Sequence, residues 1–143
     1  MLTHRSGTAG EDLYLVSVID GKVKAAVTGS KGYLEVTPTK DLLDAVSENP
    51  DGTLFSVHNH PSNIPPTGSD LSASASRGYA GSIVVLHDGG IYYYKHGNAP
   101  FPPKLFDMEC QKRIASGRPE TDAIIETLDE FRREYGVKWK KIR

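Results

Sequence analysis

The sequence predicts a mixed α/β (α+β) domain in which helices pack on a central mixed β-sheet. Short segments rich in β-forming residues alternate with segments of helical periodicity, and turn residues separate them. The most regular helical segment, near the C-terminus, carries a single apolar stripe that needs a sheet or a partner to cover it. With 143 residues, 38% hydrophobic and 24% charged, the chain suits one compact domain with a single core.

The N-terminal half predicts a hairpin, a helix and a third strand. Asp20 and Gly21 form a turn typical of a hairpin. Thr37 is the expected N-cap of the first helix, with Pro38 in its first turn. Across the whole chain, we expect strands at 12–20, 22–29, 53–60, 82–87 and 91–97, and helices at 37–49, 69–80 and 120–136.

The C-terminal half predicts a second hairpin and then a tail of different character. Gly89 and Gly90 separate the last two strands, and a Pro-rich arm follows at 99–106. The final helix stops at Gly136, and the basic run after it reads as a solvated tail. We therefore divide the chain into a flexible lead-in at 1–10, a core at 11–97 and an extension at 98–143. The apolar stripe of the last helix comprises Ile124, Ile125, Leu128, Phe131 and Tyr135.

Polar chemistry concentrates at residues 56–70, "SVHNHPSNIPPTGSD". His58 and His60 are two residues apart, so in a strand their side chains share a face. Two imidazoles so placed can converge on one ion, about 2.0–2.1 Å from each nitrogen. After the turn that begins at Pro61, Asp70 can return toward them and supply a third ligand. Three protein ligands leave a fourth tetrahedral position for water, which is typical of catalytic zinc sites.

Structural explanations of the same residues stay open. Two histidines at the end of a strand can be polar edge residues. The segment "TGSD" at 67–70 fits the capping-box pattern, in which Thr67 and Asp70 begin a helix. The two interpretations of Asp70 are compatible, because a carboxylate in the first turn of a helix is well placed to hold a metal.

The combined string, H-x-H-P followed by a loop, a hydroxyl residue, two further residues and Asp, resembles the signature of the JAB/MPN (JAMM) zinc metalloprotease domain. The spelling "HNHPS" is most similar to the bacterial RadC-type branch. The resemblance covers residues 11 to about 96. It implies a cytidine-deaminase-like sheet architecture and one Zn²⁺ per chain, bound by His58, His60 and Asp70.

Two further roles follow from the resemblance. The hydroxyl residue that stabilises the tetrahedral intermediate corresponds to Thr67, where the family has serine. The general base, a glutamate ahead of an early strand, corresponds to Glu11. Glu35 and Glu48 are alternatives, but Glu35 follows the first hairpin and Glu48 ends a helix. A metal ion, a carboxylate and a hydroxyl are the parts that amide hydrolysis needs.

The sequence thus predicts a zinc-dependent metallopeptidase or isopeptidase that acts on a peptide or protein tail. One alternative is a catalytically silent JAB-like binding or assembly module, for example in a phage structural protein or a polymorphic toxin. Another is a RadC-like DNA-linked protein, although a net charge of −1 and the lack of a basic stripe argue against nucleic acid.

The remaining expectations concern surroundings and partners. No apolar run approaches the roughly 20 residues that cross a bilayer, so we expect no membrane partner. The single cysteine, Cys110, excludes an internal disulfide and fits a cytoplasmic protein, or a virion-associated one if the chain belongs to a phage. The last helix should cover the sheet or form a homo-oligomer contact.

Overall fold

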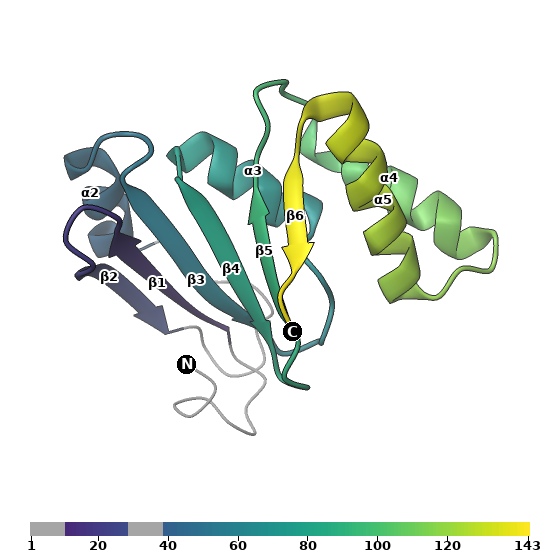
Figure 1. The fold of residues 1–143 in the computed structure, drawn as a ribbon, viewed down its shortest axis with the longest axis horizontal. Coiled ribbons are helices and arrows are strands. Elements are labelled where there is room, and N and C mark those ends of the chain that lie inside the picture. The colour runs from purple at the N-terminus through teal and green to yellow at the C-terminus, as the bar shows by residue number, and fades with distance from the viewer. Residues whose placement is uncertain (1–10, 29–38) are drawn as a thin grey trace.

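A computed structural model describes residues 11–28 and 39–143 of the protein (Figure 1). Within these ranges six strands form one mixed sheet in the order β2-β1-β3-β4-β5-β6. Strands β3 and β4 pair in parallel, and all other neighbouring strands are antiparallel. The strands are β1 (Asp12–Ser17), β2 (Val23–Thr28), β3 (Leu54–His60), β4 (Gly81–Leu86), β5 (Ile91–Lys95) and β6 (Lys138–Lys141).

Four helices accompany the sheet in the described ranges, which confirms the predicted α+β architecture. They are α2 (Lys40–Glu48), α3 (Gly68–Arg77), α4 (Pro103–Ala115) and α5 (Glu120–Tyr135). Helix α2 is capped by Thr39, whose hydroxyl accepts a hydrogen bond from the Leu42 N–H at 3.3 Å. The expected cap at Thr37, as well as Pro38, Glu35 and the lead-in at 1–10, lies outside the described residues.

Helix α4 and strand β6 correct the expectations for the C-terminal extension. The Pro-rich arm ends at Pro102, because Pro103 is the first residue of α4. Proline is favourable there, since its missing N–H would have no helical partner in the first turn. The basic tail is not merely solvated: Lys138–Lys141 pairs with β5 as an edge strand. A short lysine-rich strand is a common way to end a sheet without inviting further pairing.

The helices cover one face of the sheet and enclose the core against it (Figure 1). Three residues of the predicted stripe on α5, namely Ile124, Leu128 and Phe131, are at most 5% exposed and pack with Val84 of β4 and Tyr94 of β5. The stripe therefore covers the sheet of its own chain. This removes the observation that had suggested a homo-oligomer contact through this helix.

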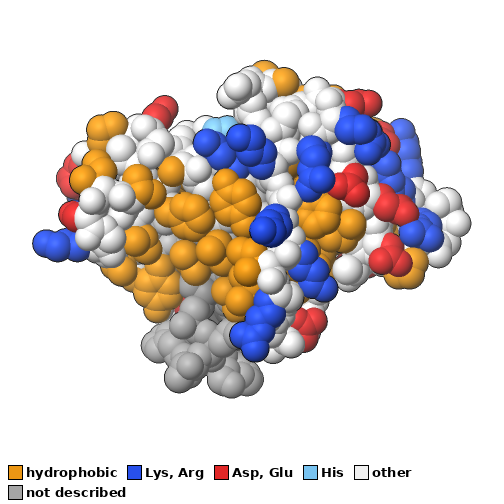
Figure 2. Space-filling model, viewed as in Figure 1, with side chains coloured by type: hydrophobic (Ala, Val, Ile, Leu, Met, Phe, Trp, Pro, Cys, Tyr) orange, Lys and Arg blue, Asp and Glu red, His pale blue; other side chains and the backbone are white. Residues whose placement is uncertain are grey.

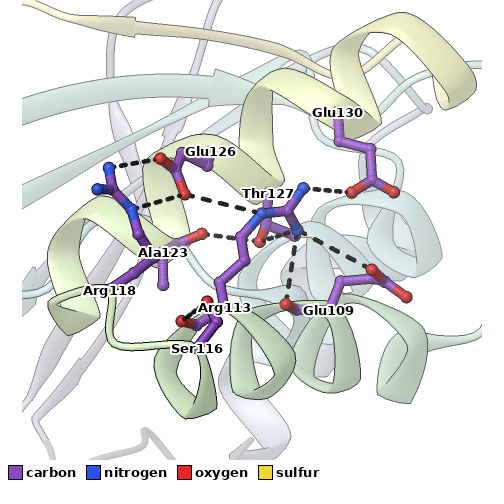
Figure 3. A network of polar contacts seen from close by, with 8 residues as sticks. All are labelled: Glu109, Arg113, Ser116, Arg118, Ala123, Glu126, Thr127 and Glu130. Atoms are coloured by element: carbon purple, nitrogen blue, oxygen red, sulfur yellow. Dashed lines mark hydrogen bonds and ion pairs between the residues drawn. The ribbon is translucent and has the colours of Figure 1, made fainter.

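A polar network fastens α5 to α4 (Figure 3). The Arg113 guanidinium of α4 donates to the Thr127 hydroxyl at 3.0 Å and to the Glu130 carboxylate at 2.7 Å. Arg118, between the helices, donates to Glu126 at 2.6 Å. Because Arg113 is a planar donor with several N–H groups, it fixes the relative orientation of the two helices as well as contributing charge.

The other face of the sheet is apolar at its centre and bordered by basic side chains (Figure 2). Tyr14, Val57, Ile83 and Tyr93 lie in register across four strands and are only half-buried. Side chains alternate between the two faces along each strand, so the residues next to these, including His58, lie on the helix-covered face. Among the described residues no helix is long and apolar enough to cross a bilayer.

Candidate metal centre

Strand β3 carries both histidines into the covered side of the sheet. It lies between β1 and β4, where His58 is in register with Leu13 and Val84. His58 is 3% exposed and His60 is 6% exposed, so neither is a polar edge residue. Their alternation with Asn59 follows directly from the two-residue period of a strand.

Three polar side chains converge at this point. His58 Nε2 lies 3.2 Å from one carboxylate oxygen of Asp70, and His60 Nε2 lies 3.2 Å from the other. The two Nε2 atoms are 3.1 Å apart. Ligand atoms about 2.0–2.1 Å from a tetrahedral zinc ion are separated by about 3.3–3.4 Å. Each of the three separations lies within a few tenths of an ångström of that ligand spacing, and together they join four atoms, because each histidine contacts a different oxygen of Asp70.

The loop that follows β3 orients the ring of His60. His60 Nδ1 lies 2.7 Å from the Ile64 carbonyl oxygen. A carbonyl can only accept, so Nδ1 carries the proton and the lone pair of the neutral ring is on Nε2, the atom in the cluster. His58 Nδ1 is buried and has no hydrogen-bond partner among the described residues. The protein therefore fixes the tautomer of His60 more firmly than that of His58.

Helix α3 holds Asp70 through its N-terminal cap. Thr67 is the N-cap and Asp70 the third helical residue of a capping box. The Thr67 N–H donates to Asp70 Oδ2 at 2.8 Å, and the Thr67 hydroxyl donates to the same oxygen at 3.1 Å. The capping-box interpretation of "TGSD" is confirmed, and the carboxylate that caps the helix also contacts both histidines.

The fold brings Glu11 to the same place from the start of β1. Glu11 is 7% exposed, and one of its carboxylate oxygens lies within 4.8 Å of a ring nitrogen of each histidine. The adjacent Asp12 N–H donates to the Asn59 side-chain oxygen at 2.6 Å, which ties this end of β1 to β3 between the histidines. Glu48, by contrast, is exposed at the end of α2. Of Glu11 and Glu48, the two candidates within the described residues, Glu11 lies at the cluster.

A cavity of about 290 Å³ opens beside the cluster and includes residues that sequence reasoning missed. Ser69 lines the cavity, and Thr67 is not among its lining residues. The Thr67 hydroxyl instead donates a hydrogen bond to Asp70 and lies 3.2 Å from the Ser69 hydroxyl. Ser69 adjoins Asp70, and Arg77 follows it by two helical turns, so the helical period contained a signal for both. Nothing local indicated Tyr79. The ten residues that line the cavity include Glu11, His58, Ser69, Asp70, Arg77 and Tyr79.

The close approach of these groups shifts their protonation. Burial by itself lowers the pKa of His60, but the Asp70 carboxylate, the Ile64 carbonyl and Glu11 together raise it to about 9. Burial raises the pKa of Asp70, yet the charges and hydrogen bonds of His60 and His58 hold it well below its usual range. Without a metal the cluster is therefore an ion pair at neutral pH, and a cation that binds there must displace the proton of His60.

Two further histidines and Cys110 lie outside the cluster. His87 contacts the Asn59 side chain at 2.8 Å, and His96 contacts the Ser74 hydroxyl at 2.9 Å. Cys110 is a buried thiol of α4, and burial raises its pKa. A scan against protein-family models, a search of the curated proteins and a search of the solved structures each returned no match.

Proposed function

We propose that the protein is a zinc-dependent hydrolase that cleaves an amide bond, as a metallopeptidase or isopeptidase of JAB/MPN type. The observation that supports this most directly is the convergence of His58, His60 and Asp70 at separations of 3.1–3.2 Å. Two imidazole nitrogens and a carboxylate are a donor set that suits zinc. The Ile64 carbonyl that contacts His60 and the Thr67 N–H that donates to Asp70 are outer contacts of the kind that orient metal ligands.

Bound there, zinc would act as a Lewis acid that polarises a carbonyl group and lowers the pKa of a water molecule. Glu11 accepts the proton of the attacking water and delivers it to the leaving nitrogen. The Ser69 hydroxyl, in the wall of the cavity, donates to the carbonyl oxygen as negative charge develops on it. Thr67 fixes the position of Asp70. These roles use no nucleophilic side chain.

Metal analysis tests the ligand set. Zinc-reconstituted protein should contain about one zinc ion per chain, and the His58→Ala/His60→Ala double variant should contain almost none. His96→Ala is the matched control, because it removes a histidine that lies outside the cluster and should keep full zinc content. Equal zinc in the wild type and the double variant would exclude this centre.

Activity tests the base. Glu11→Gln keeps the shape of the side chain but cannot accept the proton. It should retain zinc and lower the rate of peptide or isopeptide cleavage by roughly 10²–10⁴-fold, the usual contribution of general acid–base catalysis. The assay is mass-spectrometric analysis of a peptide library and of isopeptide-linked proteins. Full activity of Glu11→Gln, on a substrate that the His58→Ala/His60→Ala protein cannot cleave, would place the base elsewhere.

A further inference from the structure

One wall of the cavity is a single face of α3. Asp70, Ala73 and Arg77 follow each other at spacings of three and four residues, which places them on one side of the helix, and all three line the cavity. Seven residues of α-helix span about 10 Å. The wall therefore begins at the metal cluster, passes a small side chain and ends at a cation two turns away.

Arg77 has unused hydrogen-bonding capacity. Its guanidinium donates one hydrogen bond, to the Tyr79 hydroxyl at 3.3 Å, and no carboxylate in the described part of the chain pairs with it. A guanidinium has five N–H donors. Its place in the last turn of α3 lets the charge interact favourably with the helix terminus, but that interaction occupies no N–H group. A half-buried cation in a cavity wall is thus left with free donors.

Tyr79 adds a second donor beside Arg77. Its ring is 3% exposed, and its oxygen accepts the hydrogen bond from Arg77. Burial raises the pKa of Tyr79, so the hydroxyl keeps its proton at neutral pH. Among the described residues that proton has no acceptor. This end of the cavity therefore offers donors and positive charge, whereas the other end holds the carboxylates of Glu11 and Asp70.

We propose that Arg77 and Tyr79 bind the free carboxylate at the end of the substrate, so that the cleaved amide lies one or two residues from a C-terminus. The planar fork of an arginine suits a carboxylate, which can accept two parallel hydrogen bonds from it. The part of this inference that concerns the position of the cleaved bond rests on the proposed hydrolase function.

The length of the cavity sets the position of the cleaved bond. Side chains on a helix generally lean toward its N-terminus, so a guanidinium that follows this tendency lies nearer to Asp70 than the backbone gap of about 10 Å. One extended residue spans about 3.3–3.6 Å, so one or two residues fill what remains. A volume of about 290 Å³ is at the small end of ligand pockets and suits a segment this short.

The reaction is the hydrolysis of a near-terminal amide. The amide C–N bond breaks, the oxygen of water bonds to the carbonyl carbon, and a proton from that water passes to the leaving nitrogen. The products are a shortened chain with a new carboxylate and a released amino acid or dipeptide that retains the original carboxylate. The substrate class is therefore a peptide, or the tail of a protein, with an unblocked C-terminus.

Matched peptides test the inference with the zinc-loaded full chain. Each peptide of a mixed-sequence set is made as a free acid and as a C-terminal carboxamide, and products are identified by mass spectrometry. Acids should lose one or two residues, with kcat/KM at least tenfold above that of the amides. Arg77→Gln should abolish this preference mainly through KM, and Arg77→Lys should restore part of it. Arg133→Gln, which removes an exposed arginine of α5, should change nothing.

A binding measurement separates failure of this site from failure of the hydrolase. N-acetylated dipeptides, again as acid and amide, are titrated into the zinc-loaded protein and followed by NMR. Equal binding and cleavage of acids and amides would overturn the carboxylate site and leave the hydrolase standing. Binding that is selective for acids and lost in Arg77→Gln would support the site even if no peptide were cleaved, and the absence of cleavage would then count against the hydrolase alone.

Discussion

Asp70 has two contacts that are usually made by different residues. It caps α3 through the backbone of Thr67, and its two carboxylate oxygens contact His58 and His60. A carboxylate at a helix N-terminus is stabilised by the helix dipole as well as by these hydrogen bonds. The side chain is therefore fixed before any metal binds, and the entropy of ordering it is lost during folding instead of during binding.

The pKa shifts of His60 and Asp70 predict how the stability of the metal-free protein depends on pH. The pKa of folded His60 is raised from 6.5 to about 9, so its contribution is complete below pH 6.5 and is lost as the pH rises through 9. The pKa of Asp70 is lowered from 3.8, so its contribution is present above about pH 4 and is lost as the pH falls further. Urea unfolding in EDTA should show the greatest stability between pH 4 and 6.5.

A His60→Gln variant is the control, and its stability should no longer fall between pH 6.5 and 9. Zinc should show the opposite trend, because its binding displaces the His60 proton. Its apparent affinity should rise by up to about tenfold per pH unit until about pH 9. A zinc affinity that does not change from pH 6.5 to 9 would show that His60 does not carry this proton.

Removal of the hydroxyl of Thr67 and of Ser69 should cause different defects. Thr67→Val loses the hydrogen bond to Asp70, so we expect zinc affinity or activity to fall about 10–100-fold, as for other outer contacts of metal ligands. Ser69→Ala should keep its zinc and lose about 10²–10³-fold in kcat, because an oxyanion donor is removed. Zinc titration and steady-state kinetics distinguish them. A kcat defect in Thr67→Val alone, with normal zinc affinity, would restore Thr67 as the oxyanion donor.

At the scale of elements, α5 completes the core that supports α3. Phe131 is fully buried and contacts the rings of Phe101, Phe106 and Tyr135 at centroid distances of 4.8–5.1 Å. Phe106 belongs to α4, which also packs against α3. The extension beyond residue 97 thus helps to support the candidate metal centre.

Truncation of this ring tests that role. Phe131→Ala should lower the free energy of unfolding by about 3–5 kcal/mol, the usual cost of such a core cavity. Met108→Ala on α4 removes a side chain that is 55% exposed and should change it by less than about 0.5 kcal/mol. Chemical denaturation measures both. Equal stability of the two variants would mean that α5 does not contribute to the core.

At the scale of the whole molecule, the candidate centre joins segments far apart in the chain. Glu11 precedes β1, His58 and His60 end β3, and Asp70 begins α3. A ligand that binds only the folded chain stabilises it by about 4 kcal/mol at a thousandfold excess over Kd. Saturating zinc should therefore raise Tm by on the order of 10 °C, measured by calorimetry against EDTA-treated protein. The His58→Ala/His60→Ala protein should show no such rise.

The local pattern of the chain predicted that His58, His60 and Asp70 lie together, and the resemblance of the combined string to the JAB/MPN signature suggested that they bind a metal. Strand alternation placed His58 and His60 on one face, and the spacing of a capping box placed Asp70 in the first turn of a helix. Both rules operate over a few residues, where backbone geometry leaves few choices. The amphipathic stripe of α5 was predictable for the same reason, because its period is a property of the helix itself.

Tertiary structure decided what depends on contacts between distant residues. The place of Glu11 ahead of a strand favoured it over Glu35 and Glu48, but only the pairing of β1 with β3 brings it to the histidines. Part of the expected Pro-rich arm belongs to α4, because Phe106 packs in the hydrophobic core. The basic tail forms β6, because it pairs with the edge of β5. The cavity that joins Glu11 to Arg77 and Tyr79 also exists only in the folded chain, because its walls come from separate strands and from α3. Such contacts form only when burial of apolar surface outweighs the entropy of closing long loops, and the whole chain determines that balance.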